Sequence, residues 1–558
     1  MLLVLLALLP VSLVASPVVN TPYGAVEGFQ YPLPDGKEAN IFLGIPYAQP
    51  PVGELRFEKP KRAENWNTVI QAKEFGAFCF QHSSAKRIAG KNVSFSEDCL
   101  TMNIMAPSEK SADPNGYPVM VFIHGGGFEL GSSGIFPYEN ISQNFIPEGI
   151  VFVTFNYRLS AFGFLSTGDK VVPGNMGYWD MTLALQFIRD SIANFGGNPG
   201  SVTVTGESAG ASSVSALTFS PHSNTLFDRA IAMSGSQYSS YANSTNSIDS
   251  TRRLAKALGC QGCSSKKTVA CLKQKSAKEI RAAIGQLGFS NDEFNFLLFT
   301  PLIDGAFLPY ETDKLLQEAP KIPTIQGVTD QEGGFFSLYK LPTLFKTNIP
   351  SDKWKTYSAD DLTQFLKQKM IVKNYGSQKD ALIAKMIDFY VNSPNNESYL
   401  QRYADLFTHL FFAVPAYQEA QDKAAAQIPV YLYREEFTNI LTKKMPFSGA
   451  FHGNELSYLL GSFVYGRFEF DNADRAFQRD LLSGFISFAK TGTPIVGGRP
   501  WEPVTKKHPG RYMSFSANSQ MKDNFIKEAV DFWTKDVCEI GGVERMVRET
   551  LVPALKCA

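Results

Sequence analysis

A serine flanked by glycines is the first residue in this sequence that could do covalent chemistry. Ser208 lies at the centre of Gly206-Glu207-Ser208-Ala209-Gly210, within the stretch TVTGESAGAS. A serine hydroxyl is a poor nucleophile alone, so it needs a base within hydrogen-bond reach and an acid that orients the base. The alternative is an ordinary serine at a helix start. Because short Gly/Ser strings recur by chance, the rest of the chain has to decide.

The elements expected around Ser208 favour the nucleophile. The preceding VTVT is typical of a strand, and the following ASSVSAL is typical of a helix. A nucleophile on a tight strand-to-helix turn needs small neighbours, which Gly206 and Gly210 supply. The helix start also adds backbone N–H groups where an oxyanion would form.

A glycine-rich segment about 80 residues earlier predicts an oxyanion hole. His124-Gly125-Gly126-Gly127 follows the apolar stretch PVMVFI. Successive glycines leave backbone N–H groups unobstructed, and Ala209, directly after the nucleophile, would supply a further donor. A flexible glycine turn is the alternative, but a position at the end of an early strand favours the oxyanion hole.

Chain order selects the base. An α/β hydrolase presents its nucleophile first, then an acid, then a histidine. The six histidines are His82, His124, His222, His409, His452 and His508. The first two precede the serine, the third follows it too closely, the fourth falls in an amphipathic helical pattern, and the last falls in a polar turn. Elimination leaves His452, in the loop SGAFHGNEL.

The acid is not fixed by spacing. The segment IPTIQGVTDQEGGFF (322–336) predicts a strand that ends in a loop carrying Asp330 and Glu332. Either carboxylate could orient the imidazole, so both remain candidates at this point.

The distribution of apolar runs predicts an α/β fold. Strands are expected within 118–127, 149–159, 201–217, 226–236 and 428–437, and a helix over 180–197. Apolar strands that alternate with helices indicate a large, mostly parallel central sheet with helices on both faces. Residues 240–300 and 340–425 are more polar and helical, which predicts helical insertions over an active-site gorge. We expect a single domain over 17–558.

Composition narrows the function. The chain has 558 residues with 53 basic and 53 acidic side chains, so its formal charge is zero. That balance argues against a nucleic-acid partner, which needs a basic face. The 44 Phe residues favour core packing, or alternatively an apolar substrate gorge. The predicted chemistry requires neither a metal nor a cofactor.

The N-terminus predicts secretion. MLLVLLALLPVSLVAS is too short to cross a bilayer and is typical of a signal peptide, here 1–16, although no Lys or Arg precedes its apolar run. No later segment has 18 uninterrupted apolar residues, so we expect no membrane anchor. Four glycosylation sequons and seven cysteines agree with an extracellular protein. The sequons begin at Asn92, Asn140, Asn243 and Asn396.

Blocks of sequence extend these patterns along nearly the whole chain. They include FLGIPYAQPPVGELRF, EDCLTMNI, HGGGF, NYRLSAFGFL, GNMGYWDMTLAL, FGGNPGSVTVTGESAG, PLIDGAFLP, QEGG and FHGNEL, in that order. With them the chain resembles the type-B carboxylesterase/cholinesterase family of α/β hydrolases.

The resemblance implies a role for each candidate. By it, Ser208 is the nucleophile, His452 the base, and Glu332 the acid, because the family pattern has Glu directly before Gly there. The implied oxyanion hole consists of Gly126, Gly127 and Ala209. Glu207 matches a carboxylate that tunes the site, and Arg158 and Asp180 match positions where an ion pair is expected.

Disulfides follow from the resemblance as well. It implies Cys79–Cys99 and Cys260–Cys271, and leaves Cys538 with Cys557, Cys263 or another chain as partner. Cys260 and Cys263 form a C-x-x-C pattern, but a redox or zinc site needs further context, which the sequence lacks.

The expected substrate is a small, uncharged carboxylic ester, cleaved through an acyl-enzyme. Cholinesterases carry a Trp in the first disulfide loop, whereas this loop has none and contains Lys86, Arg87 and Lys91. Lipases and hormone or pheromone esterases are the main alternatives, and a cholinesterase or a non-catalytic adhesion protein is less favoured. Phe289, Phe294, Phe296 and Phe299 are candidates for the acyl pocket. A homo-oligomer is compatible with the sequence, which does not fix the oligomeric state.

Overall fold

The structure is a computed structural model that describes most of the chain. The described residues are 16–81, 93–288, 297–338, 346–369, 377–541, 543, 547–548, 551, 553 and 556–557. Several predicted features lie outside them, namely 1–15 of the signal segment, His82, Lys86, Arg87, Lys91, Asn92, Phe289, Phe294 and Phe296.

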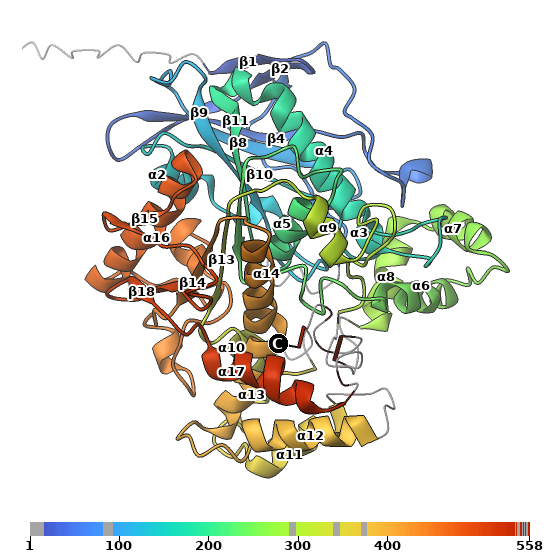
Figure 1. Cartoon of the computed structure of the whole chain (residues 1–558). Coiled ribbons are helices and arrows are strands. Elements are labelled where there is room, and N and C mark those ends of the chain that lie inside the picture. Colours follow the sequence, from blue (N-terminus) through green and yellow to red (C-terminus); the bar gives the residue numbers. More distant parts are fainter. Residues whose placement is uncertain are drawn as a thin grey trace, which may run out of the picture.

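An 11-stranded sheet forms the centre of the molecule, in the order β18-β17-β14-β13-β12-β11-β9-β10-β8-β4-β3 (Figure 1). From β17 to β10 every neighbouring pair is parallel, and the remaining pairs are antiparallel. This confirms the predicted mostly parallel sheet. The strands are β3 (Phe29–Pro32), β4 (Glu38–Pro46), β8 (Thr101–Pro107), β9 (Tyr117–Ile123), β10 (Val151–Phe155), β11 (Gly197–Glu207), β12 (Arg229–Met233), β13 (Thr324–Thr329), β14 (Val430–Glu435), β17 (Tyr512–Phe515) and β18 (Gln520–Lys522).

Alternate side chains of the central strands enter two separate cores. Val119 and Val121 of β9 belong to the core that also contains Leu185 of α4 (Met176–Ser191) and Val214 of α5 (Ala209–Phe219). Met120, between these valines, belongs instead to the core packed against α2 (Tyr138–Phe145) and α16 (Asn472–Thr491). Because successive side chains of a strand point to opposite faces, a continuous apolar run is what a sheet covered on both faces requires.

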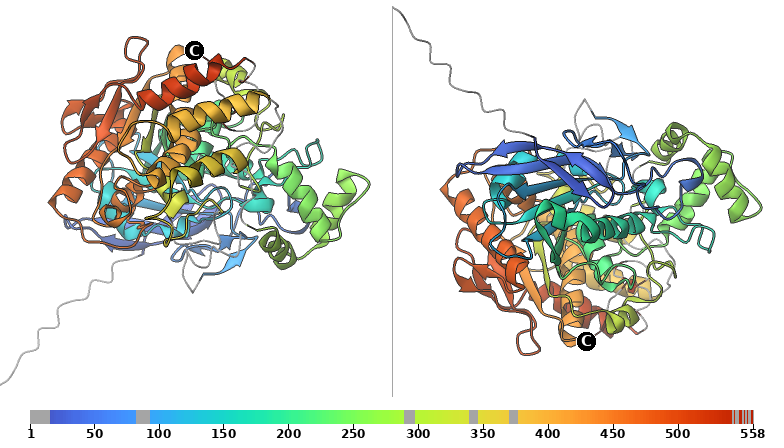
Figure 2. Two further views of the ribbon diagram at one scale, coloured as in Figure 1. Left: turned by 90° about the horizontal axis from the view of Figure 1, so that it is seen from below. Right: turned by 90° about the horizontal axis from the view of Figure 1, so that it is seen from above.

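The two segments predicted to be helical insertions do contain helices. The first contains α6 (Asn246–Ala257), α7 (Ser265–Gln274) and α8 (Ala277–Leu287), and it projects from the body in every view (Figures 1 and 2). A later group contains α11 (Ala359–Lys369), α12 (Ser377–Tyr390), α13 (Tyr399–Phe407) and α14 (Val414–Ala425). Within the described residues, no helix combines the length and apolar character needed to cross a membrane.

Three disulfides stabilise loops and the C-terminal segment. Cys79–Cys99 and Cys260–Cys271 are bridged, and these are the pairings that the resemblance implied. Cys538 pairs with Cys557, which selects one of the three partners left open, and Cys263 remains an exposed thiol.

The described sequons differ in exposure. Asn396 lies in an exposed loop, whereas Asn140 and Asn243 are half-buried. The Asn140 side chain packs so closely on Gly461 that a Cβ at that glycine would lie 2.2 Å from the Asn140 Cγ atom. Asn396 therefore has the most accessible amide of these three.

Candidate active site

Ser208 lies in a strained turn between β11 and α5. Its backbone has φ 60° and ψ −126°, a combination that L-residues rarely adopt. Two hydrogen bonds hold this conformation: the Ser208 N–H donates to the Met233 carbonyl at 2.8 Å, and the Ser208 carbonyl accepts from the Ser212 N–H at 3.0 Å. The turn fixes the serine directly at the start of the helix.

The glycines around Ser208 are required by close backbone contacts. A Cβ at Gly210 would lie 2.1 Å from the Ile123 carbonyl oxygen, at the end of β9. A Cβ at Gly206 would lie 2.5 Å from the carbonyl carbon of Gly210. No side chain fits at either position, which explains the spacing of the glycines physically.

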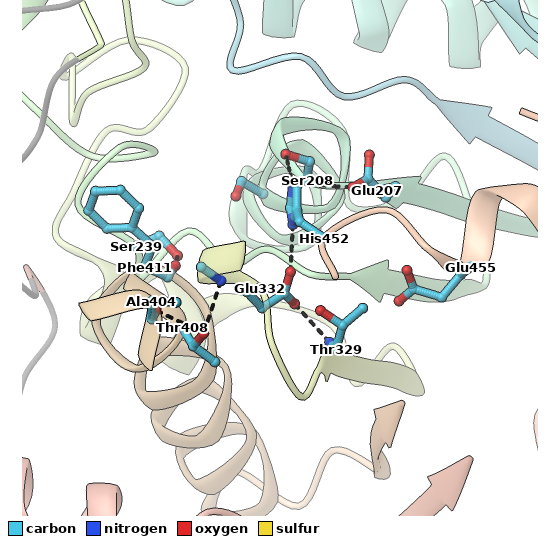
Figure 3. Close-up of polar contacts among 12 residues, drawn as sticks. Glu207, Ser208, Ser239, Thr329, Glu332, Ala404, Thr408, Phe411, His452 and Glu455 are labelled. Atoms are coloured by element: carbon cyan, nitrogen blue, oxygen red, sulfur yellow. Dashed lines mark hydrogen bonds and ion pairs between the residues drawn. The ribbon is translucent and has the colours of Figure 1, made fainter. Parts of the chain in front are cut away.

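Ser208, His452 and Glu332 form one chain of hydrogen bonds (Figure 3). The Ser208 hydroxyl lies 2.8 Å from His452 Nε2, and His452 Nδ1 lies 2.5 Å from Glu332 Oε2. In the neutral imidazole, Nδ1–H donates to the carboxylate and Nε2 accepts from the hydroxyl. The arrangement therefore has the geometry of a base poised to take a proton from the serine.

Glu332 is held in the loop after β13. Its Oε1 atom accepts from the Thr329 N–H at 2.8 Å, and its side chain is fully buried. The glycines that follow permit close packing: a Cβ at Gly333 would lie 1.8 Å from the Ala404 carbonyl oxygen of α13, and one at Gly334 would lie 2.8 Å from the Phe451 ring. Glycine after the glutamate lets α13 and the histidine loop approach it.

Asp330, the other acid that spacing left open, contacts the histidine loop and not the imidazole. Its Oδ1 atom accepts from the Ala450 N–H at 2.7 Å, and its own N–H donates to the Glu435 carbonyl at 2.9 Å. Behind the ring, the Tyr465 hydroxyl donates to the His452 carbonyl oxygen at 2.7 Å. These contacts position the backbone that carries His452.

The other described histidines do not reach the serine. His124 is buried against the Tyr157 ring, with centroids 4.5 Å apart, and burial lowers its pKa to about 4. His409 is buried 3.0 Å from the Tyr390 hydroxyl, and burial lowers its pKa to about 3. His222 and His508 are exposed. Burial keeps the first two rings neutral, as expected of core residues.

The glycine turn after β9 lies directly against the nucleophile. A Cβ at Gly125 would lie 2.8 Å from the Ser208 Cβ atom. Gly126 and Gly127 have φ values of 111° and 62°, and a Cβ at Gly126 would lie 2.1 Å from the Leu130 carbonyl oxygen. Across the described residues, the backbone N–H groups of Gly126, Gly127 and Ala209 make no hydrogen bond. They remain available to a ligand oxygen.

Buried carboxylates set the charge of the imidazole. Glu207 Oε1 lies 3.3 Å from His452 Nε2, and burial raises the pKa of Glu207 to about 7, although His452 opposes the shift. Burial alone would lower the pKa of His452, but Glu207 and Glu332 outweigh it and raise that pKa above its ordinary value. The site therefore stabilises an imidazolium, the species that forms when His452 takes a proton.

Aromatic rings surround the imidazole. The centroids of Phe412, Phe336 and Phe335 lie 4.7, 5.5 and 5.7 Å from that of His452. Leu297 borders the glycine turn, with a methyl carbon 3.3 Å from where a Cβ on Gly127 would lie. The walls are apolar, which strengthens every electrostatic contact within the site.

Two features near the site were outside the reach of sequence reasoning. Tyr465 has no spacing or motif that predicts its contact with His452. Glu129 follows the glycine turn, and its buried Oε1 atom accepts from the Phe299 N–H at 2.8 Å, so it ties the turn to the segment that contains Leu297. A carboxylate beside HGGGF was a visible signal, but its partner lies 170 residues away.

The predicted ion pair is confirmed. The Arg158 Nη2 atom lies 2.6 Å from Asp180 Oδ1, and the Arg158 backbone N–H and Nε both donate to Oδ2. Both side chains are buried. Among the described residues, no cluster of three or more His, Cys, Asp or Glu could hold a metal ion.

The sheet, the strained serine turn and its two polar partners define an α/β hydrolase. Comparison with known sequences identifies the family within this class. The sequence model of the carboxylesterase family matches residues 15–533, so this chain belongs to that family. It is a carboxylic ester hydrolase.

Similar proteins span nearly the same length. Gut esterase 1 of Caenorhabditis briggsae is 35% identical over 535 residues, which cover 93% of this chain and 92% of that protein. Gut esterase 1 of Caenorhabditis elegans is 33% identical, with 93% of each chain covered. Carboxylesterase 1D of Rattus norvegicus is 32% identical, again with 93% of each chain covered.

Proposed function

We propose that this enzyme cleaves uncharged carboxylic esters with a Ser208–His452–Glu332 triad and an acyl-enzyme intermediate. The observation that carries the proposal is the continuous contact from the Ser208 hydroxyl through the imidazole to Glu332, at 2.8 and 2.5 Å. Glu332 lies 120 positions and Ser208 lies 244 positions from His452 in the sequence, so only the fold brings them together.

Acylation begins when His452 Nε2 takes the hydroxyl proton as Ser208 Oγ attacks the ester carbonyl. The carbonyl oxygen becomes an oxyanion, which accepts hydrogen bonds from the N–H groups of Gly126, Gly127 and Ala209. A preorganised donor of this kind contributes about 3–4 kcal/mol to transition-state stabilisation. His452 then gives its proton to the leaving alcohol, and the acyl group remains on Ser208.

Deacylation repeats these steps with water. His452 takes a proton from the water, the hydroxide attacks the acyl carbon, and the acid leaves as the proton returns to Ser208 Oγ. Glu332 keeps the Nδ1–H tautomer and stabilises the imidazolium in both halves of the cycle. Glu207 adds a second negative charge beside Nε2 and supports the same charged species.

The apolar walls support an uncharged substrate. Phe335, Phe336, Phe412 and Leu297 offer dispersion contacts to alkyl or aryl groups. Glu207, 3.3 Å from the imidazole, would repel an anionic ester. The length of the preferred acyl chain separates a carboxylesterase from a lipase and is a matter for measurement.

The test is kcat/KM over nitrophenyl esters of increasing acyl length, with acetylthiocholine as the cationic substrate. We expect the neutral esters to be cleaved, with Ser208→Ala at least about 10⁴-fold slower. A fluorophosphonate probe should label Ser208 alone. Ser212→Ala, one helical turn further along α5, is the matched control and should keep its activity.

Two results would overturn the proposal. Retention of activity in Ser208→Ala would assign the nucleophile elsewhere, and preferential hydrolysis of acetylthiocholine would assign a cholinesterase. Loss of activity in Ser212→Ala without loss of fold would show that the helix itself is too sensitive to identify the nucleophile by substitution, and would leave the site assignment unsupported.

We also propose that the protein is secreted, with residues 1–16 removed and the sequons glycosylated. Three disulfides support this, since such bridges persist in oxidising compartments. Expression in a eukaryotic host should yield medium-borne protein that begins at Pro17 and carries a glycan at Asn396. Mass spectrometry of the N-terminal peptide and of deglycosylated Asn396 peptides checks both points, and an intracellular product that begins at Met1 would contradict the proposal.

A further inference from the structure

The zero net charge of the chain conceals two oppositely charged parts. Residues 246–287, which span α6, α7 and α8, contain nine Lys and Arg but only two Asp and Glu. This insertion therefore has a formal excess of seven positive charges. Because the whole chain sums to zero, the remainder carries an excess of seven negative charges. A charge sum over the sequence hides this separation.

The basic part is a distinct projection. Figures 1 and 2 show α6, α7 and α8 extending from one side of the body in all views. The Cys260–Cys271 bridge joins the segment after α6 to α7, with Cα atoms 5.4 Å apart. Ser276 and Glu279 form a capping box at the start of α8. The helices therefore present their side chains from a braced scaffold.

Most of its cations face solvent without a carboxylate partner. Lys273 is an exception, since it lies 2.7 Å from Glu58. Five other side chains are exposed and make no ion pair within the described part of the chain. These are Arg252, Lys256, Lys266, Lys267 and Lys278.

The geometry of α6 brings two of these cations onto one face. Arg252 and Lys256 are four residues apart on α6, so they share one face of that helix. Lys256 and Lys267 each precede a bridged cysteine by four residues. Cations gathered on one projecting insertion attract a polyanion more strongly than the same charges dispersed over the body.

We propose that the α6–α8 insertion binds a sulfated polysaccharide. An anionic polymer with many charges matches an insertion that carries several exposed cations without ion-pair partners among the described residues. Three disulfides favour an oxidising, extracellular setting, where nucleic acid and cytoplasmic anionic leaflets are not the natural partners.

The surface also lacks the features of membrane insertion. A helix that lies in a bilayer interface buries large apolar side chains. None of the exposed large hydrophobic residues falls within 246–287, where every residue is described. The surface is therefore suited to a hydrated polyanion rather than to a lipid interior.

The test measures binding of the full chain to heparin as a function of NaCl concentration. Wild type should bind at 150 mM NaCl and weaken steadily as salt rises, because binding releases counterions. Charge reversal at the five exposed positions should weaken binding at least about tenfold and flatten the salt dependence. The variant is R252E/K256E/K266E/K267E/K278E.

A matched control reverses five exposed lysines on the body, which gives the same net charge change. That variant is K110E/K353E/K355E/K506E/K507E. It should bind heparin as wild type does. A variant with Gln at the five insertion positions covers the case in which reversal disturbs the helices, and circular dichroism and thermal melting verify the fold of each variant.

Three results would overturn the proposal. The first is heparin binding by the insertion variants equal to that of wild type, and the second is an equal loss of binding in the body variant. The third is tighter binding of wild type to duplex DNA or phosphatidylserine vesicles than to heparin at the same salt. Neutral dextran should not bind. Ester hydrolysis by the insertion variants should stay within about twofold of wild type, so the outcome is independent of the catalytic proposal.

Discussion

The buried Arg158–Asp180 pair and the buried carboxylate Glu207 have different surroundings. Asp180 receives three hydrogen bonds from Arg158, at 2.6, 2.8 and 3.0 Å. Glu207 is buried to a similar degree, but its one ionic contact among the described residues is His452 Nε2 at 3.3 Å. Burial raises the pKa of both carboxyl groups. The difference lies in how completely each charge is compensated.

Complete compensation produces a structural element, whereas incomplete compensation produces a chemical one. The Arg158 guanidinium keeps its proton at any working pH, so the balancing cation of the Arg158–Asp180 pair is always present. At the triad, the balancing cation exists only when His452 is protonated, which happens during each half of the proposed cycle. The carboxylates there are positioned to stabilise the imidazolium of His452, which is present during only part of the cycle. Substitutions at the triad should therefore affect activity, whereas substitutions at the Arg158–Asp180 pair should affect stability.

The largest expected effect is the loss of activity in Glu332→Gln. The amide keeps the volume but cannot stabilise the imidazolium, and it permits the wrong imidazole tautomer. We expect kcat/KM to fall about 10⁴-fold, which is the scale measured for the equivalent change in another serine triad. Ester hydrolysis and thermal melting of the same preparation check whether activity falls without loss of fold.

Asp330→Asn is the control for that substitution. It lies two residues away, is half-buried, and keeps an oxygen that can accept from the Ala450 N–H. Its activity should remain within about tenfold of wild type, because a neutral hydrogen bond of this kind is worth about 1 kcal/mol. Equal losses in both variants would mean that loop position, rather than the charge on Glu332, controls the reaction.

The structural side should respond in stability. Asp180→Asn leaves the buried Arg158 guanidinium without a counter-charge, and breaking such a pair typically costs about 3–5 kcal/mol. Urea unfolding should show this decrease, while kcat per folded molecule stays near that of wild type.

The apolar double variant R158M/D180L sharpens this expectation. Replacing a buried pair with apolar residues of similar volume is often nearly neutral, so the double variant should recover most of the lost stability. A double variant as unstable as Asp180→Asn would show that the hydrogen bonds to the Arg158 backbone, rather than charge compensation, supply the stability.

The contrast between these two groups also separates what the sequence could predict from what it could not. Ser208 was predictable because a strained turn imposes small neighbours within two residues. His452 was predictable by elimination among six histidines. The choice between Asp330 and Glu332 was open from spacing, since both are loop carboxylates and only the resemblance selected Glu332. The structure distinguishes them by contact: one touches the imidazole and the other touches the backbone of Ala450.

The fold was similarly predictable in its regular part. Continuous apolar runs fixed the parallel strands, and the alternation of strand and helix fixed the covered faces. Contacts between residues far apart in the chain have no local signal, so neither the bond from Phe299 to Glu129 nor the one from Tyr465 to His452 could be expected. The charge of the α6–α8 insertion was present in the sequence, but a sum over the whole chain concealed it.

Glu207→Gln tests whether the charge of Glu207, which within the described part of the chain only His452 balances, controls the pKa of that imidazole. Glu207 raises the pKa of His452, together with Glu332 and, more weakly, Glu455. Removing its charge should lower that pKa, so the neutral imidazole persists to lower pH and the acid limb of kcat/KM moves down. The pH-independent value of kcat/KM should fall roughly ten- to hundredfold, because the imidazolium of the transition state loses one favourable carboxylate.

The direction of the pH shift is the decisive readout for Glu207. A fall in activity with an unchanged acid limb would mean that Glu207 acts through packing and not through charge. Glu207→Asp should retain the charge and thus most of the shift in the pKa of His452, which separates charge from shape.

The smallest expected effect belongs to Tyr465→Phe. The substitution removes one neutral hydrogen bond, from the hydroxyl to the His452 carbonyl oxygen at 2.7 Å, and leaves the ring in place. Such a bond contributes about 0.5–1.5 kcal/mol net, so kcat/KM should fall by no more than about tenfold. The acid limb should not move, because the pKa of His452 depends on carboxylates that this change leaves intact. Steady-state kinetics between pH 5 and 9 check both expectations. A loss comparable to that of Glu332→Gln would place the Tyr465 hydroxyl within the reaction itself and would erase the distinction between groups that hold the base and groups that compensate its charge.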